Sequence, residues 1–177
     1  MTRSELEHLI RSAGAISGDD EIVVIGSQSV LGQFPDAPVA LLASMEADVF
    51  PLNRPEKSDL IDGSIGEGSK FHEQFGYYAQ GVSEETATLP RGWRSRLIAV
   101  SNSNTRGVTG LCLEVHDLAI SKYVAGREKD LEFTQALTTH GLTKRDTLLQ
   151  RLGETPVSEA FKSLITLRIK GHFRTKK

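Results

Sequence analysis

The sequence has little cysteine and no long apolar run, and both absences narrow the class of protein. A single cysteine, Cys112, excludes an internal disulfide framework and fits a reducing compartment. It lies in the apolar run Leu111-Cys112-Leu113, so we interpret it as a small core residue and not as a nucleophile. No stretch reaches the roughly 20 apolar residues that span a bilayer, and Glu5 and Glu7 interrupt the segment where a secretory signal would be apolar. We therefore expect a cytoplasmic protein that does not contact a membrane.

Acidic side chains are missing from the C-terminal end of the chain. Although the net charge is only -2, residues 161–177 contain no Asp or Glu, and they carry the basic residues Lys162, Arg168, Lys170, Arg174, Lys176 and Lys177. Two interpretations stay open. The stretch is either a solvated helix with a basic tail, or an electrostatic contact for nucleic acid or another polyanion.

The organisation of the chain favours an α+β fold. Its 177 residues, 38% of them hydrophobic and 25% charged, suit one globular domain. Strand signals dominate the first half and helical periodicity the second, which predicts a small mixed β-sheet flanked by helices, with a helical C-terminal half. We expect an α/β core at residues 1–113 and a helical region at 114–177 packed on it, together forming one compact domain.

Hydrophobic periodicity and turn residues predict the individual elements. Strands are expected at residues 21–25, 46–52, 77–82, 97–101 and 109–113. Helices are expected at residues 4–13, 27–33, within 56–75, and from Glu114 onward in four segments that end near Gly126, Gly141, Leu152 and Ile169. Gly14 is predicted to stop the first helix.

The pair Gly26-Ser27 lies between the first predicted strand and a short helix. Glycine lets a backbone approach a ligand closely, and the start of a helix offers unpaired N–H groups to a phosphate. The turn is therefore a candidate phosphate-binding segment, although plain tight turns have the same pattern.

The next predicted strand carries two acidic residues in Glu46-Ala47-Asp48. Residues two apart on a strand project from the same face, so both carboxylates can reach one hard cation such as Mg2+. Without a cation the two charges repel each other. A solvated polar strand face is the alternative interpretation of the same pattern.

Together, the Gly26-Ser27 turn and the Glu46-Ala47-Asp48 motif resemble the nucleotidyltransferase superfamily. A further stretch, from Asp117 through Lys122 and Gly126-Arg127 to Asp130, resembles the helical segment of its abortive-infection and toxin–antitoxin branch. It is closer still to an uncharacterised bacterial family related to that branch. The resemblance covers about residues 20–152.

The resemblance implies a role for each matching residue. Gly26 and Ser27 would hold the nucleotide phosphates, and Glu46 and Asp48 would bind one or two Mg2+ ions as catalytic ligands. Lys122 would be a catalytic residue that neutralises the triphosphate, and Arg127 and Asp130 would belong to the nucleotide-binding residues. Asp130 would orient Lys122 or Arg127. The alternative interpretation of these helical residues is a pair of surface helices linked by local ion pairs, each of which contributes little to stability.

The implied reaction moves a nucleoside monophosphate from an NTP to an RNA, protein or small-molecule acceptor. A toxin–antitoxin or defence role with a cognate partner protein follows from the branch. Active members place a third carboxylate on a later strand, where this chain offers Gln80, with Glu84 or Glu114 as substitutes. An amide cannot act as a general base. Two rivals therefore remain: a catalytically degenerate fold that binds a nucleotide or a partner, and a nucleic-acid-binding regulator that uses residues 161–177.

Overall fold

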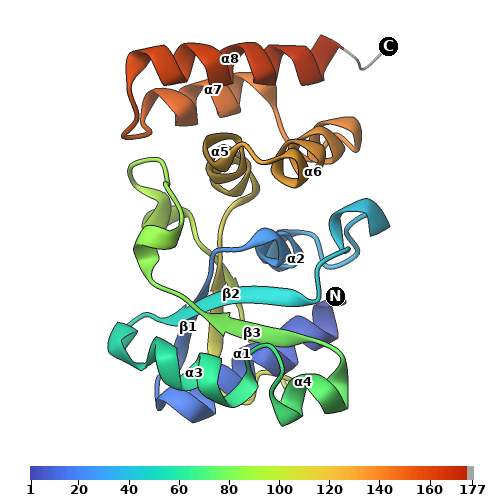
Figure 1. Ribbon diagram of the computed structural model, residues 1–177, viewed down its shortest axis with the longest axis vertical. Coiled ribbons are helices and arrows are strands. Elements are labelled where there is room, and N and C mark those ends of the chain that lie inside the picture. The colour runs from blue at the N-terminus through green and yellow to red at the C-terminus, as the bar shows by residue number, and fades with distance from the viewer. Residues whose placement is uncertain (175–177) are drawn as a thin grey trace. The chain divides into compact units, whose positions relative to one another are not determined.

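The computed structural model describes residues 1–174, and Lys176 and Lys177 of the basic stretch lie outside the described residues. Within that range the chain forms a five-stranded mixed β-sheet and eight α-helices (Figure 1). The α+β expectation is confirmed. No helix in this range is long and apolar enough to cross a lipid bilayer.

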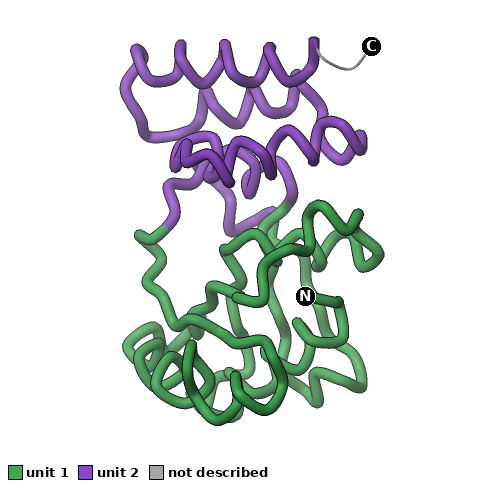
Figure 2. Tube along the Cα trace, turned by 45° about the vertical axis from the view of Figure 1, so that its right-hand side comes forward, with its two compact units in different colours: residues 1–86, 97–114 green, residues 87–96, 115–177 purple. Residues whose placement is uncertain are grey.

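The chain divides into two compact units (Figure 2). Unit 1 contains residues 1–86 and 97–114, and unit 2 contains residues 87–96 and 115–177. The division into domains at residues 113 and 114 stays a prediction, because a compact unit is not by itself a domain that folds alone.

Unit 1 contains the whole sheet, in the strand order β3-β2-β1-β5-β4. Its strands are β1 (Glu21–Val24), β2 (Glu46–Pro51), β3 (Tyr78–Gly81), β4 (Ile98–Val100) and β5 (Thr109–Cys112). Its helices are α1 (Arg3–Ser17), α2 (Val30–Gln33), α3 (Ser58–Ile65) and α4 (Lys70–Phe75). All five predicted strands are therefore present, each within one or two residues of its predicted bounds.

The central strand β1 is antiparallel to β2 and parallel to β5. The two edge strands pair in different ways. Strand β3 runs parallel to β2, and β4 runs antiparallel to β5. Ile22, Val23 and Val24 of β1 are fully buried, as expected for a central strand covered on both faces. Cys112, which pairs with Val24, is also fully buried, and burial raises the pKa of its thiol to about 12. The interpretation of Cys112 as a core residue is confirmed.

Helix α1 is longer than predicted. Thr2 and Glu5 form a capping box at its start, which satisfies backbone N–H groups there. Gly14 does not stop the helix. It lies buried against the Val108 side chain, which a Cβ at this position would collide with. The helix ends instead at Gly18, whose φ of 69° gives the left-handed conformation that glycine adopts without strain.

Unit 2 is helical. It contains α5 (Val115–Ala125), α6 (Glu128–Thr139), α7 (Arg145–Gly153) and α8 (Glu159–Arg174), together with a short 3-10 turn at Trp93–Arg96. The last helix begins and ends later than predicted. The Ser158 side chain accepts a hydrogen bond from the Phe161 N–H and so caps the start of α8. Buried Ile165 and Ile169 fix its inner face.

A buried carboxylate holds unit 2 together. The Asp117 side chain in α5 is fully buried and accepts two hydrogen bonds from Arg96, at 2.8 and 3.0 Å. Arg151 of α7 lies 3.3 Å from the same carboxylate. A buried carboxylate needs such partners, because its desolvation is costly. The cluster explains why residues 87–96 belong with the C-terminal helices.

We predict that Asp117→Asn lowers the free energy of unfolding by about 3 kcal/mol or more, because Arg96 and Arg151 then lose their shared counter-charge. Urea denaturation measures this loss. Asp146→Asn is the matched control, since it breaks an exposed pair with Arg145 and is expected to change stability by less than about 0.5 kcal/mol. Equal losses in the two variants would contradict a structural role for Asp117.

Candidate functional site

The glycine–serine turn and the acidic strand of the sequence analysis meet at one end of β1. The backbone N–H of Ile25 donates to the Asp48 carbonyl at 3.0 Å and extends the antiparallel pairing of β1 with β2. Gly26 then lies directly against Asp48, and a Cβ at Gly26 would collide with the Asp48 carboxylate. Its φ of −79° is ordinary for any residue, so what requires glycine here is space for the carboxylate.

Glu46 and Asp48 alternate along β2 with two buried apolar residues. Ala47 and Val49 are fully buried, whereas Glu46 and Asp48 are only half-buried. The side chains of a strand alternate between its faces, so the two carboxylates share the face opposite Ala47 and Val49. Two carboxylates on one strand face are candidate ligands for a cation. The same-face arrangement predicted from the spacing is therefore present.

Tyr78 supports this face, and the sequence reasoning missed it. Tyr78 pairs with Glu46 in the parallel ladder between β2 and β3, and its hydroxyl donates to Glu46 Oε2 at 3.2 Å. Burial and the nearby Glu46 charge raise the pKa of Tyr78 to about 12, so it stays a donor at neutral pH. The strand register would have been needed to find this contact.

Gln80 is the β3 partner of Asp48. Its side chain is exposed, and the pairing places it on the same face as Asp48. Within residues 1–174 no group of three or more His, Cys, Asp or Glu residues could hold a metal ion. Neither Glu84 nor Glu114 therefore completes a three-carboxylate site with the pair.

Ser27 begins a short 3-10 turn, Ser27–Ser29, immediately after Gly26. The turn closes through a hydrogen bond from the Ser29 N–H to the Gly26 carbonyl at 3.0 Å. Ser27 is half-buried, whereas Gln28 and Ser29 are fully buried beneath it. Ser27 is thus the residue of this turn whose side chain reaches the surface.

Lys122, Arg127 and Asp130 come together within unit 2. Asp130 is almost fully buried, accepts hydrogen bonds from Arg127 at 2.6 and 3.2 Å, and lies 3.7 Å from Lys122 Nζ. Burial alone would raise the pKa of Asp130, but the Arg127 hydrogen bonds and the Lys122 charge lower it. Gly126, with a φ of 64°, forms the bend between α5 and α6. Asp117 does not join this group, because it binds Arg96 and Arg151.

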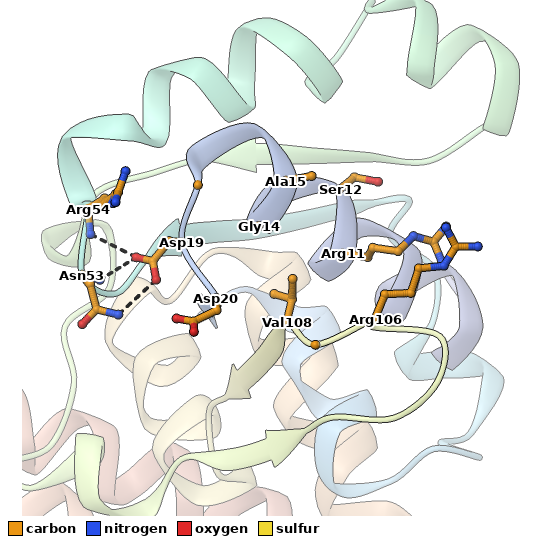
Figure 3. Close-up of a pocket in the computed structure, with 12 residues that line it drawn as sticks. Arg11, Ser12, Gly14, Ala15, Asp19, Asp20, Asn53, Arg54, Arg106 and Val108 are labelled. Atoms are coloured by element: carbon orange, nitrogen blue, oxygen red, sulfur yellow. Dashed lines mark hydrogen bonds between the residues drawn. The ribbon is translucent and has the colours of Figure 1, made fainter.

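A cavity of about 900 Å³ lies at the other end of β1, before Glu21 (Figure 3). Asp19 lines it and accepts hydrogen bonds from the backbone and side chain of Asn53 and from the Arg54 backbone. The Arg11 and Arg106 side chains point toward each other at its opposite side. The sequence-predicted site residues do not line this cavity.

We predict that Gly26→Ala displaces the Asp48 carboxylate and lowers the affinity of the acidic face for Mg2+ by about tenfold or more, with a stability loss of about 1–3 kcal/mol. Isothermal titration calorimetry and urea denaturation measure the two effects. Gly63→Ala is the matched control, because a Cβ there meets nothing within 4 Å inside helix α3. A Gly26→Ala protein that binds Mg2+ like the control would contradict the close approach to Asp48.

Comparison with known proteins identifies one matching family. The family described as "Nucleotidyltransferase of unknown function (DUF6036)" matches residues 4–163. Comparisons with curated proteins and with solved structures gave no match. The matched range contains the Gly26-Ser27 turn, the acidic face and the Lys122–Asp130 segment. The chain therefore belongs to this nucleotidyltransferase family.

Proposed function

We propose that unit 1 binds an NTP with Mg2+ at the Gly26-Ser27 turn and the Glu46–Asp48 face, and transfers a nucleoside monophosphate to an acceptor hydroxyl. One observation carries the proposal. The glycine of the turn lies in contact distance of the Asp48 carboxylate, so that a phosphate at the turn would also be beside the metal ligands. Membership in a nucleotidyltransferase family supports an NTP as the substrate.

The residues on this face fit Mg2+. Glu46 and Asp48 offer carboxylate oxygens from one strand face, and the ion prefers one or two carboxylates together with water and substrate phosphates. Two protein carboxylates therefore suffice to hold one ion. When bound, the ion would supply polarisation of the α-phosphate and stabilisation of the charge on the attacking and leaving oxygens.

The protein residues have separate tasks in this proposal. Gly26 has no side chain and so lets the Asp48 carboxylate lie against the turn. The Ser27 hydroxyl can donate a hydrogen bond to phosphate oxygens bound at the same turn. Tyr78 donates to Glu46 Oε2 and thereby fixes the orientation of that carboxylate. In the transfer, the acceptor oxygen bonds to the α-phosphorus, pyrophosphate leaves, and the acceptor hydroxyl loses its proton.

Gln80 limits how that proton is removed. It lies beside Asp48 in the ladder, and its amide oxygen can accept a hydrogen bond from the acceptor hydroxyl but cannot act as a general base. The proton then passes to solvent or to the leaving phosphate, which makes the transfer slow. RNA, a protein or a small molecule would serve as acceptor, and a role in a toxin–antitoxin or defence system stays a prediction. The phosphate-binding roles of Lys122 and Arg127 also stay predictions.

The alternative is a binding module that holds the nucleotide without turnover. Gln80, the β3 partner of Asp48, favours this alternative, because among the described residues no third Asp or Glu joins Glu46 and Asp48 in a group that could hold a metal ion. The two functions differ in one property only, which is the appearance of labelled product.

We expect label from an α-labelled NTP to move onto an acceptor in the presence of Mg2+ and bulk cellular RNA and protein, and Glu46→Gln/Asp48→Asn to abolish the transfer. Loss of two metal ligands removes the ion that the reaction needs. All four NTPs are tested, and a parallel titration measures Mg2+-dependent nucleotide binding. Binding without transfer by the wild type would establish the binding module, and neither binding nor transfer would refute both functions.

We further predict that Gln80→Glu raises the transfer rate by about tenfold or more, because it places a carboxylate beside Asp48 where a general base can act. Single-turnover kinetics at pH 7 and 8 measure the rate. Gln80→Asn is the matched control, since it keeps an amide at the same exposed position. A Gln80→Glu rate no higher than that of the control would show that proton removal is not limited at this position.

A further inference from the structure

A groove of about 310 Å³ lies in unit 2 between the start of α7 and the end of α8. Arg145, Lys170, Phe173 and Arg174 line it. Arg145 is the first residue of α7, and the other three residues belong to the last turns of α8. Among the described residues, the lining of the groove thus contains three cations and one aromatic ring and no acidic side chain.

The packing of α8 determines which residues face the groove. Ile165 and Ile169 are fully buried, and the His172 ring lies 2.8 Å from the Tyr123 hydroxyl, so these residues define the inner side of the helix. Burial also lowers the pKa of His172, so the His172 ring is uncharged at pH 7 where it contacts Tyr123. Lys170, Phe173 and Arg174 are three and four positions apart and share one side of the helix.

The electrostatics of the groove favour an anion. Lys170 and Arg174 are exposed, and residues 161–174 contain no acidic side chain that would neutralise them. Arg145 forms an ion pair with Asp146 at 3.1 Å, but the Asp146 side chain is 85% exposed. Water screens such a pair strongly, so a phosphate can displace it. The positive charge is therefore available to a ligand.

We propose that this groove binds single-stranded nucleic acid, with the three cations contacting backbone phosphates and Phe173 stacking on a base. Lys170 and Arg174 are one helical turn apart, about 6 Å along the axis, so they can contact different phosphates of one strand. A base stacks on an aromatic ring only where the base is unpaired. This favours a single strand over a duplex, and a ring in the lining favours nucleic acid over a bare polyanion.

An anionic membrane is the rival ligand, because Leu164 and Leu167 of the same helix are 44% and 68% exposed. A basic helix with exposed leucines is typical of a membrane surface. The concave shape of the groove favours a strand instead, because a lipid surface contacts a convex helix face. The proposal does not rest on the proposed nucleotidyl transfer, since none of the groove residues belongs to the acidic face.

The test measures binding of the full chain to a fluorescein-labelled single-stranded RNA of about 12 nucleotides by anisotropy, over a series of salt concentrations. We expect Arg145→Gln/Lys170→Gln/Arg174→Gln to weaken binding at least tenfold and to reduce the slope of log K against log salt by roughly 2, since each lost phosphate contact removes about 0.7. Phe173→Leu is expected to weaken binding about fivefold or more without changing this slope, because it removes stacking alone.

Three further variants serve as controls. Lys129→Gln removes an exposed cation of α6 outside the groove and is expected to leave affinity within twofold. Asp146→Asn removes the competing carboxylate and is expected to tighten binding. Asp48→Asn is expected to bind RNA like the wild type, so a failure of the acidic face to transfer nucleotides does not affect this result. Circular dichroism verifies that each variant is folded.

Three results would overturn the proposal. The first is RNA binding that is undetectable, or that the triple variant retains. The second is equal binding of RNA and inorganic polyphosphate with no effect of Phe173→Leu, which would show a bare polyanion site. The third is groove-dependent binding to phosphatidylserine vesicles that exceeds binding to RNA, which would show a membrane surface.

Discussion

The antiparallel pairing of β1 with β2 is the constraint on which the candidate site depends. It places the Gly26 turn against the Asp48 carboxylate, with a separation that leaves no room for a Cβ. It also fixes which face of β2 carries the acidic residues. A slip of one residue would turn Glu46 and Asp48 toward the side that now holds Ala47 and Val49. The burial of those two residues therefore holds the carboxylates where a cation can reach them.

The parallel edge strand β3 decides how the acidic face is completed. It brings Tyr78 to Glu46 and Gln80 to Asp48, so one carboxylate gains a hydrogen-bond donor and the other gains a neutral amide. In the proposed function the two carboxylates would hold Mg2+, while the strand position beside Asp48 carries an amide, which cannot act as a general base. The family match indicates a nucleotidyltransferase, whereas this one amide favours the alternative proposal of a binding module.

In unit 2, the buried carboxylates are paired with basic side chains. Its two buried carboxylates, Asp117 and Asp130, are each held by cations, and these pairs hold the helices and the 87–96 segment together. Among the other basic side chains of α7 and α8, Arg145, Lys170 and Arg174 are exposed and line one groove. Two residues that the sequence placed in one motif, Asp117 and Asp130, therefore belong to separate ion clusters.

Local pattern was sufficient to determine the strands, the same-face spacing of Glu46 and Asp48, the burial of Cys112 and the basic character of residues 161–177, which contain no Asp or Glu. These features depend on neighbours in the sequence, such as β-branched runs and period-two alternation. The contact of Gly26 with Asp48, the support from Tyr78 and the role of Asp117 were decided only by the tertiary structure. Each depends on strand register or helix packing between residues 21 or more positions apart, and a single sequence contains no local signal for those. The extent of α1 through Gly14 has the same cause, since packing against Val108 outweighs the low helix propensity of glycine.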